Sequence, residues 1–106
     1  MPLPEHLQAG YRFSRMHAFD LAQVSAFAFA AGDTNPLHHD AVAAAGSRFG
    51  KPTASGTHTS ALLMGLVAAH YAVLGQVVGV RFTMELLRPV FADETVTLAW
   101  EVTSAC

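Results

Sequence analysis

Asp33 and His38 are the two residues of this sequence whose types and spacing best suit catalysis. They flank the turn-forming pair Asn35-Pro36. A turn can bring a carboxylate and an imidazole to one point, where they can hold a single water molecule between them. General acid–base chemistry requires that arrangement. Apolar neighbours would partly exclude solvent from the pair and shift its pKa values toward working pH.

The same segment allows two other interpretations. An Asp after a helix-ending glycine, followed by Asn-Pro, is also common in purely structural turns. His38, His39 and Asp40 are metal-ligand types, but adjacent histidines usually point in different directions, and no third ligand has suitable spacing. We therefore expect no metal site. Spacing alone leaves both the structural turn and the catalytic site open.

The elements that must position this segment follow from the apolar pattern. Residues 11–19 roughly alternate apolar and polar, which predicts a first strand. Asp20 and Gln23 form a capping-box pattern, so a helix is predicted over residues 20–32. A short alanine-rich helix over residues 40–46 follows the polar loop.

A long apolar helix is predicted over residues 57–74, after a loop rich in Gly, Pro and Ser. Its apolar residues cover nearly every side, which is typical of a helix buried all round. Residues 76–90 and 95–104 are predicted to form two further strands. Three strands are too few to enclose such a helix. We therefore expect that another chain covers the open sheet edge, or that this sequence is short relative to its fold.

The composition narrows the class of protein. The 106 residues predict one domain, over residues 1–106. Hydrophobic residues make up 52% and charged residues 13%, which excludes a disordered chain. Proteins that bind nucleic acid usually carry an excess of positive charge, and the net charge of -2 gives no sign of one. The single cysteine, Cys106, allows no internal disulfide, and neither a signal peptide nor a membrane span is visible. We expect a cytoplasmic protein that binds neither nucleic acid nor membrane.

The segment around Asp33 resembles the signature of the MaoC-like dehydratases, or (R)-specific enoyl-CoA hydratases. The matching positions are Phe29, Ala31, Gly32, Asp33, Asn35, Pro36, Leu37, His38 and Ala44. Residues 49–59 and 87–96 match the family in the same order along the chain. The sequence departs from the pattern at Ala31, where Ser, Thr, Gly or Cys is usual. Family domains also continue for about two more typical strands, which this chain lacks.

The resemblance implies an α+β hot-dog fold, in which an antiparallel sheet wraps around one long helix, and pairing into a homodimer. It implies that Asp33 and His38 are the catalytic pair, acting on a water molecule. It also implies that backbone N–H groups at Gly56 bind the thioester oxygen, and that Asn35 shapes the loop. The implied reaction is (R)-specific hydration of trans-2-enoyl-CoA, or the reverse dehydration of (R)-3-hydroxyacyl thioesters.

No cofactor is expected, because coenzyme A or acyl carrier protein only carries the acyl group. His58, Met64, Phe82 and Met84 are candidates to contact the substrate, the last three as the lining of an acyl tunnel. Apolar residues at such spacings are more often plain core, and a histidine at a helix start often only bonds nearby backbone. His70 is expected in the core and His39 in an exposed or structural place. Two alternatives stay open: a hot-dog thioesterase, and a non-catalytic acyl-thioester-binding subunit that needs a partner chain.

Overall fold

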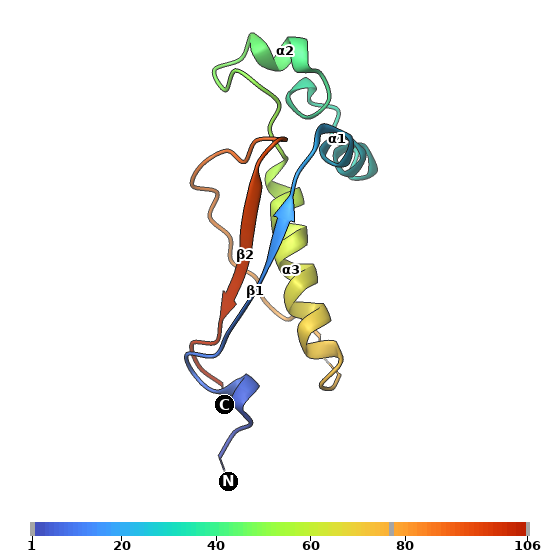
Figure 1. Ribbon diagram of the computed structural model, residues 1–106. Coiled ribbons are helices and arrows are strands. Elements are labelled where there is room, and N and C mark those ends of the chain that lie inside the picture. Colours follow the sequence, from blue (N-terminus) through green and yellow to red (C-terminus); the bar gives the residue numbers. More distant parts are fainter. Residues whose placement is uncertain (1, 77, 106) are drawn as a thin grey trace.

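The computed structural model describes residues 2–76 and 78–105, and its elements form an elongated body of 58 × 22 × 21 Å (Figure 1). Two strands lie beside one long helix; one short helical segment precedes the first strand, and three more follow it before the long helix. In chain order the elements are η1 (Glu5–Leu7), β1 (Arg12–Ala18), α1 (Leu21–Ala30), η2 (Pro36–His38), α2 (Ala41–Ala45), α3 (Gly56–Ala72) and β2 (Thr95–Glu101).

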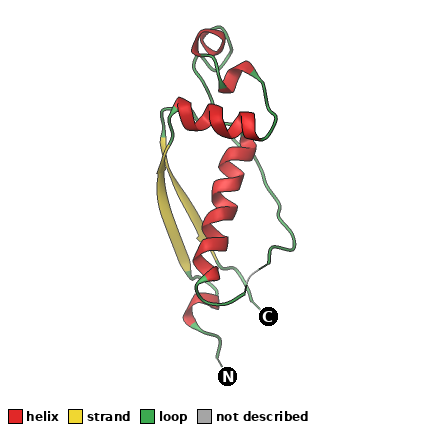
Figure 2. Ribbon diagram, turned by 90° about the vertical axis from the view of Figure 1, so that its right-hand side faces the viewer, coloured by secondary structure: helices red, strands yellow, loops and turns green. Residues whose placement is uncertain are grey.

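The sheet is antiparallel and packs on α3, as the sequence predicted. Strands β1 and β2 pair in register from Arg12 opposite Glu101 to Ala18 opposite Thr95. Figure 2 shows the sheet running along one side of α3, with α1 crossing near the start of that helix. Trp100 on β2 donates a hydrogen bond from its indole N–H to the Leu63 carbonyl in the middle of α3 (2.7 Å). This bond ties the sheet to the helix.

Side-chain caps start the helices where the sequence placed them. The Asp20 carboxylate accepts from the Gln23 backbone N–H (2.8 Å), which is one half of the predicted capping box. The Gln23 side-chain amide donates to the Asp20 carboxylate (3.1 Å) and to the Ala18 carbonyl (3.2 Å), and not back to the Asp20 N–H group as in the full motif. Asp40 caps α2, and the Ser55 hydroxyl accepts from the His58 backbone N–H at the start of α3. Each cap satisfies N–H groups that a helix cannot pair internally.

The long helix is present over Gly56–Ala72, close to the predicted residues 57–74, but it is not buried all round. Only His58, Ser60 and Leu66 are fully buried along it. The reason is that two paired strands cover one side of the helix and leave the remainder half-buried or exposed. None of the described helices is long and apolar enough to cross a membrane.

The predicted strand over residues 76–90 is wrong for the described part of that segment; residue 77 lies outside the described residues. Residues 78–88 run without strand pairing, although their apolar side chains alternate as in a strand. A strand needs a hydrogen-bonded neighbour, and the described residues supply one only at Phe91, which bridges to Thr53. The last strand is shorter than predicted and ends at Glu101.

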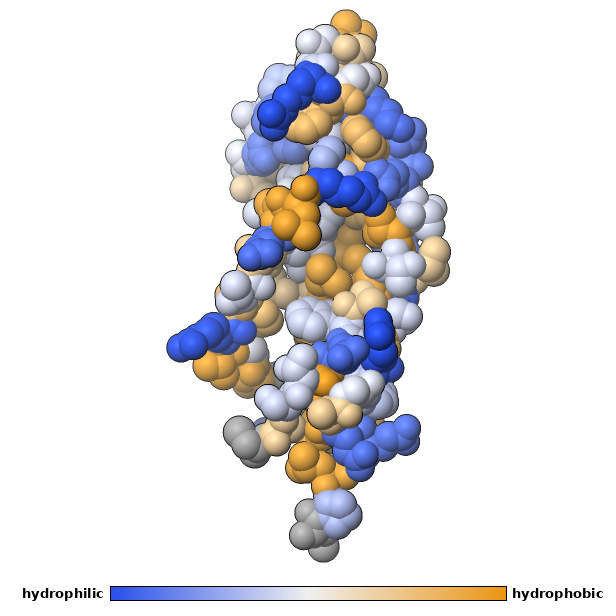
Figure 3. All heavy atoms as spheres, turned by 90° about the vertical axis from the view of Figure 1, so that its left-hand side faces the viewer, coloured by the Kyte–Doolittle hydropathy of each residue, from blue (hydrophilic) through white to orange (hydrophobic). Residues whose placement is uncertain are grey.

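Large apolar side chains therefore remain on the surface along this segment. Those at least 46% exposed are Val78, Val80, Phe82, Met84, Leu86 and Leu87. The space-filling view shows apolar patches interleaved with charged residues along the length of the molecule (Figure 3).

The hydrophobic core lies at the end of the molecule where α1, the start of α3 and the start of β2 meet. Phe19, Val24, Ala54 and Ala92 form its centre, and Val24 is completely buried. The partly buried residues Leu21, Leu62, Val90 and Val96 pack around them. The best-packed part of the chain is thus next to the loop that carries Asp33 and His38.

Candidate active site

The loop after α1 holds Asp33 through short-range hydrogen bonds. Gly32 adopts a positive φ of 79°, which ends the helix and turns the chain. The Asp33 backbone N–H donates to the Ala28 carbonyl (2.7 Å), and the Asp33 carboxylate accepts from the Asn35 N–H (3.0 Å). Asn35 in turn accepts from the Leu37 N–H (3.1 Å). The segment is therefore a structural turn, and the turn also orients a carboxylate.

His38 is buried beside this carboxylate. Its Nε2 lies 3.3 Å from Oδ2 of Asp33, and its Nδ1 lies 2.7 Å from the Thr53 carbonyl oxygen. A carbonyl oxygen can only accept, so Nδ1 carries a hydrogen and donates it. In the neutral ring, Nε2 then presents its lone pair toward Asp33. The His38 side chain is 10% exposed and that of Asp33 37%, so the pair is open to solvent on the Asp33 side.

A lone pair and a carboxylate at this distance need a proton between them. Either the ring is protonated and forms an ion pair with Asp33, or a water molecule donates to both groups. In the second case the water oxygen keeps its own lone pairs for attack on an electrophile. In either case the protonation of one group depends on that of the other, so the pair is able to act as one unit in proton transfer. Both sequence-predicted residues are brought together.

Gly56 begins α3, three residues after the Thr53 carbonyl that holds His38. The first N–H groups of a helix have no partner within it and lie at its positive end. A cavity of about 420 Å³ opens at this helix end. It is lined by Arg48, Phe49, Ala54, Gly56, Thr59, Leu86, Leu87, Arg88, Pro89 and Val90. The segment before α3 thus connects the His38 ring with a cavity that contains Gly56.

The absence of a side chain at Gly56 matters in this cavity. A Cβ atom at that position would collide with the side chain of Leu86. Leu86 belongs to the unpaired segment 78–88 and is itself 68% exposed. The close approach therefore involves the movable end of an exposed side chain, and the backbone at Gly56 is accessible when that side chain turns away.

His58 does not line this cavity. It is 5% exposed, and its ring stacks on Phe27 of α1 at 4.4 Å with a 3° interplanar angle. Its Nδ1 is buried without a hydrogen-bond partner in the described part of the chain. Burial lowers the pKa of His58, and the charge of nearby His17 lowers it further. The His58 ring of α3 therefore packs against α1 and does not face the cavity at Gly56.

The three apolar residues predicted to contact the acyl chain, Met64, Phe82 and Met84, lie outside the cavity at Gly56. Met64 is half-buried on α3, whereas Phe82 and Met84 are 52% and 46% exposed. Met84 contacts the Ser60 hydroxyl on the first turns of α3. Their role in binding an acyl chain stays a prediction.

His70 is half-buried on the face of α3 that packs on β1, hydrogen-bonded as predicted but outside the core. Its Nε2 is 2.8 Å from the Tyr11 hydroxyl, and its ring stacks on Phe13 at 3.9 Å. His70 therefore fastens α3 to β1, far along the helix from Gly56.

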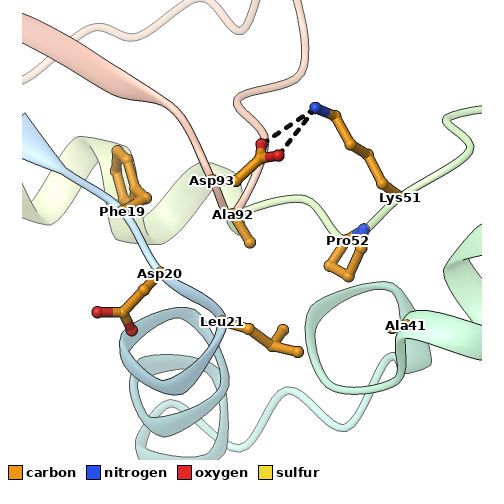
Figure 4. Close-up of a pocket in the computed structure, with 8 residues that line it drawn as sticks. All are labelled: Phe19, Asp20, Leu21, Ala41, Lys51, Pro52, Ala92 and Asp93. Atoms are coloured by element: carbon orange, nitrogen blue, oxygen red, sulfur yellow. Dashed lines mark hydrogen bonds and ion pairs between the residues drawn. The ribbon is translucent and has the colours of Figure 1, made fainter.

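A second cavity, also about 420 Å³, gave no signal in the sequence. Figure 4 shows it between the start of α1, α2 and the turn before β2, with Lys51 and Asp93 paired at its rim. Lys51 Nζ lies 3.1 Å from both carboxylate oxygens of Asp93 and sits over the Phe91 ring. Its lining residues come from four separate segments of the chain, so no local sequence motif could predict this cavity.

A metal site is not formed by the adjacent histidines. The rings of His38 and His39 are 6.3 Å apart and inclined by 78°, so they face different partners. Among the residues that the structure describes, no group of three His, Cys, Asp or Glu side chains is placed to hold a metal ion.

Comparison with known proteins gives consistent matches. The family model described as "MaoC like domain" matches residues 4–105. An (R)-specific enoyl-CoA hydratase of Aeromonas caviae is 33% identical over 101 residues, which is 94% of this chain and 74% of that protein.

Solved structures agree with this match. The A. caviae (R)-hydratase involved in PHA biosynthesis superposes with a TM-score of 0.74 at 32% identity, covering 90% of this chain and 71% of that chain. The R-hydratase of Pseudomonas aeruginosa gives 0.74 at 26% identity, covering 90% and 61%. A protein of Archaeoglobus fulgidus gives 0.79 at 29% identity, covering 93% and 62%.

Proposed function

The chain belongs to the MaoC-like domain family, and from that premise we propose that it adds water to trans-2-enoyl thioesters, giving (R)-3-hydroxyacyl thioesters, or catalyses the reverse dehydration. The observation that carries this proposal is the buried His38 ring, fixed by the Thr53 carbonyl so that Nε2 lies 3.3 Å from the Asp33 carboxylate. The matches to the family model, to the A. caviae hydratase and to its solved structure confirm three predictions from the sequence: the family, the α+β hot-dog fold and the enzyme class.

In the hydration direction, the Asp33–His38 pair orients a water molecule and accepts one of its protons while the water oxygen bonds to C3 of the substrate. The double bond's electrons move toward the thioester carbonyl, and an enolate forms. A proton is then delivered to C2 by the same coupled pair, so H and OH have added across the double bond and no other reactant is consumed.

The enolate oxygen needs hydrogen-bond donors at the moment its charge develops. We assign this role to the backbone N–H groups at Gly56, because they lie at the start of α3 and in the cavity next to the segment that holds His38. Asn35 supports the reaction indirectly, since its N–H fixes one oxygen of Asp33.

The test is hydration of crotonyl-CoA by the purified protein, followed by loss of the enoyl absorbance. Asp33→Asn keeps the size of the side chain and removes the base, so we expect its turnover to fall by about a hundredfold or more. Chiral analysis of the product checks the (R) configuration. Release of free thiol in place of water addition would support the thioesterase alternative. A folded wild-type protein that binds enoyl-CoA without converting it would support the non-catalytic alternative.

We also propose that the chain forms a homodimer or higher homo-oligomer. Extended residues 78–88 present alternating apolar side chains without a strand neighbour, and Val80 is 94% exposed. Such a segment is prone to pair with another chain. Light scattering of the wild type against Val80→Lys checks this, with a smaller particle expected for the variant. Cytoplasmic location and the choice of carrier stay predictions.

A further inference from the structure

His39 follows the proposed catalytic histidine but serves another part of the site. Its half-buried ring lies between α1 and the loop that carries Asp33. The ring is inclined by 78° to that of His38, so it takes no direct part in the Asp33–His38 pair. The sequence indicated only an exposed or structural role for it.

The hydrogen bonds of His39 define which nitrogen carries the proton. Its Nε2 lies 2.8 Å from the Asp33 backbone carbonyl oxygen, which can only accept, so Nε2 donates. In the neutral ring, Nδ1 is then an acceptor, and the Ser25 hydroxyl donates to it at 2.6 Å. The Asp33 carbonyl, which can only accept, therefore sets the tautomer of His39, and the Ser25 hydroxyl, which can donate or accept, satisfies the remaining nitrogen.

The first helix holds the His39 ring at two points. Ser25 and Phe29 are four residues apart on α1 and so lie on the same face of the helix. Ser25 bonds the ring edge, and Phe29 stacks on the ring face at 3.8 Å with a 25° interplanar angle. The imidazole is thus a rigid link from α1 to the Asp33 peptide group.

This link completes the fixation of Asp33. The N–H of Asp33 donates to the Ala28 carbonyl, and its C=O accepts from His39. One carboxylate oxygen accepts from the Asn35 N–H, which leaves Oδ2 directed at His38. The backbone of Asp33 is thus held on both sides, and its carboxylate is held between the Asn35 N–H and the His38 ring.

We propose that His39 is a positioning residue for the reaction: its Nε2–H bond to the Asp33 carbonyl sets the Asp33 carboxylate against His38, and the Ser25 hydroxyl holds the other ring nitrogen. This inference rests on the proposed function. Displacement of a reacting group by about 1 Å can cost about a hundredfold in rate, so loss of this bond acts on turnover more than on binding.

Two matched variants separate the hydrogen bond from ring packing. His39→Gln places an amide nitrogen where Nε2 was and can still donate, whereas His39→Phe keeps a flat ring against Phe29 and cannot donate. We expect His39→Phe to lower kcat about tenfold to a hundredfold with KM nearly unchanged. We expect His39→Gln to stay within about threefold of the wild type. The reverse order would show that only packing matters and would overturn the proposal.

A second measurement does not depend on activity. Nitrogen NMR of the wild-type imidazoles distinguishes the two neutral tautomers, and we expect the Nε2–H form at His39. The Nδ1–H form in the wild type would overturn the proposed bond, whatever the activity. A wild-type protein that shows the Nε2–H form but hydrates no enoyl thioester would overturn the proposed function and, with it, the positioning role of His39 in that reaction.

Discussion

Residues 33–38 and residues 78–88 both approach the start of α3, but they are held there by different means. The first stretch is fixed by hydrogen bonds to backbone groups, such as the bond from His38 Nδ1 to the Thr53 carbonyl. The second stretch makes side-chain contacts, among them Leu86 over Gly56 and Met84 beside Ser60, and has no strand partner in the described residues.

The difference shows which part of the site this chain can define by itself. Directional bonds with partners at most 15 residues away fix the orientation of the Asp33 and His38 groups. Apolar contacts have no preferred direction, and they leave the second stretch with most of its large side chains exposed. We therefore expect substitutions in the loop to change chemistry, and substitutions at the contact between the two stretches to change access.

The largest effect is expected from His38→Asn. The asparagine amide can keep the hydrogen bond to the Thr53 carbonyl, while the basic Nε2 is lost. Turnover of crotonyl-CoA should fall by about a hundredfold to ten-thousandfold. Thermal unfolding should show His38→Asn to be more stable than His38→Ala by about 1 kcal/mol, because only the alanine leaves the buried carbonyl unpaired. Appreciable turnover by His38→Asn would mean that the loop orients some other group.

The next effect concerns the contact between the two stretches. In Gly56→Ala the new Cβ meets Leu86, whose exposed side chain can move aside, so the free energy of unfolding should change by less than about 1 kcal/mol. Activity should fall by about tenfold, because the methyl group blocks the approach to the helix N–H groups.

The double variant Gly56→Ala/Leu86→Ala is the control for this contact. It removes the colliding side chain, and activity should stay low if the methyl group itself is the obstacle. Recovery of activity in the double variant would instead place the cause in the displaced Leu86.

A smaller effect is expected far from the loop. His70→Gln loses the stacking on Phe13 and weakens the bond to Tyr11, so the protein should lose about 1 kcal/mol of stability. Turnover per folded molecule should not change. A selective loss of kcat at unchanged stability would show that this end of α3 communicates with the loop.

The smallest effect is a pH dependence from His58. Its pKa is lowered in the folded protein, chiefly by burial and then by His17, so the unfolded chain binds the proton more readily. Stability from this group is fully present above pH 6.5, the unfolded value, and is lost as pH falls from there toward the folded-state pKa. The free energy of unfolding is measured by denaturant titration at several pH values. In His58→Phe this contribution to its dependence on pH should be missing. An identical pH dependence of stability in wild type and variant would contradict a lowered pKa of His58.

The sequence predicted well what depends on near neighbours. The helix cap at Asp20, the turn at Gly32 and the length of α3 all follow from residues within a few positions of each other. The close approach of Asp33 and His38 was also predictable from near neighbours, since a single turn brings them together.

What the sequence could not supply depends on distant segments. The alternation over residues 78–88 is that of a strand, but a strand forms only beside a partner, and local pattern does not say whether one is present. The bond from Ser25 to His39 and the cavity rimmed by Lys51 and Asp93 likewise join segments that only the fold brings together.

The fluorescence of Trp100 can report on the contact between the sheet and α3. Trp100 is the single tryptophan of the chain, and its N–H bonds the Leu63 carbonyl on α3. Its fluorescence therefore follows the docking of β2 on the middle of the helix and not the order of the loop around Asp33. In a denaturant titration followed by both emission and turnover, coincident midpoints would indicate a single cooperative unit. Earlier loss of turnover would show that the catalytic loop unfolds as a separate unit while the sheet stays docked.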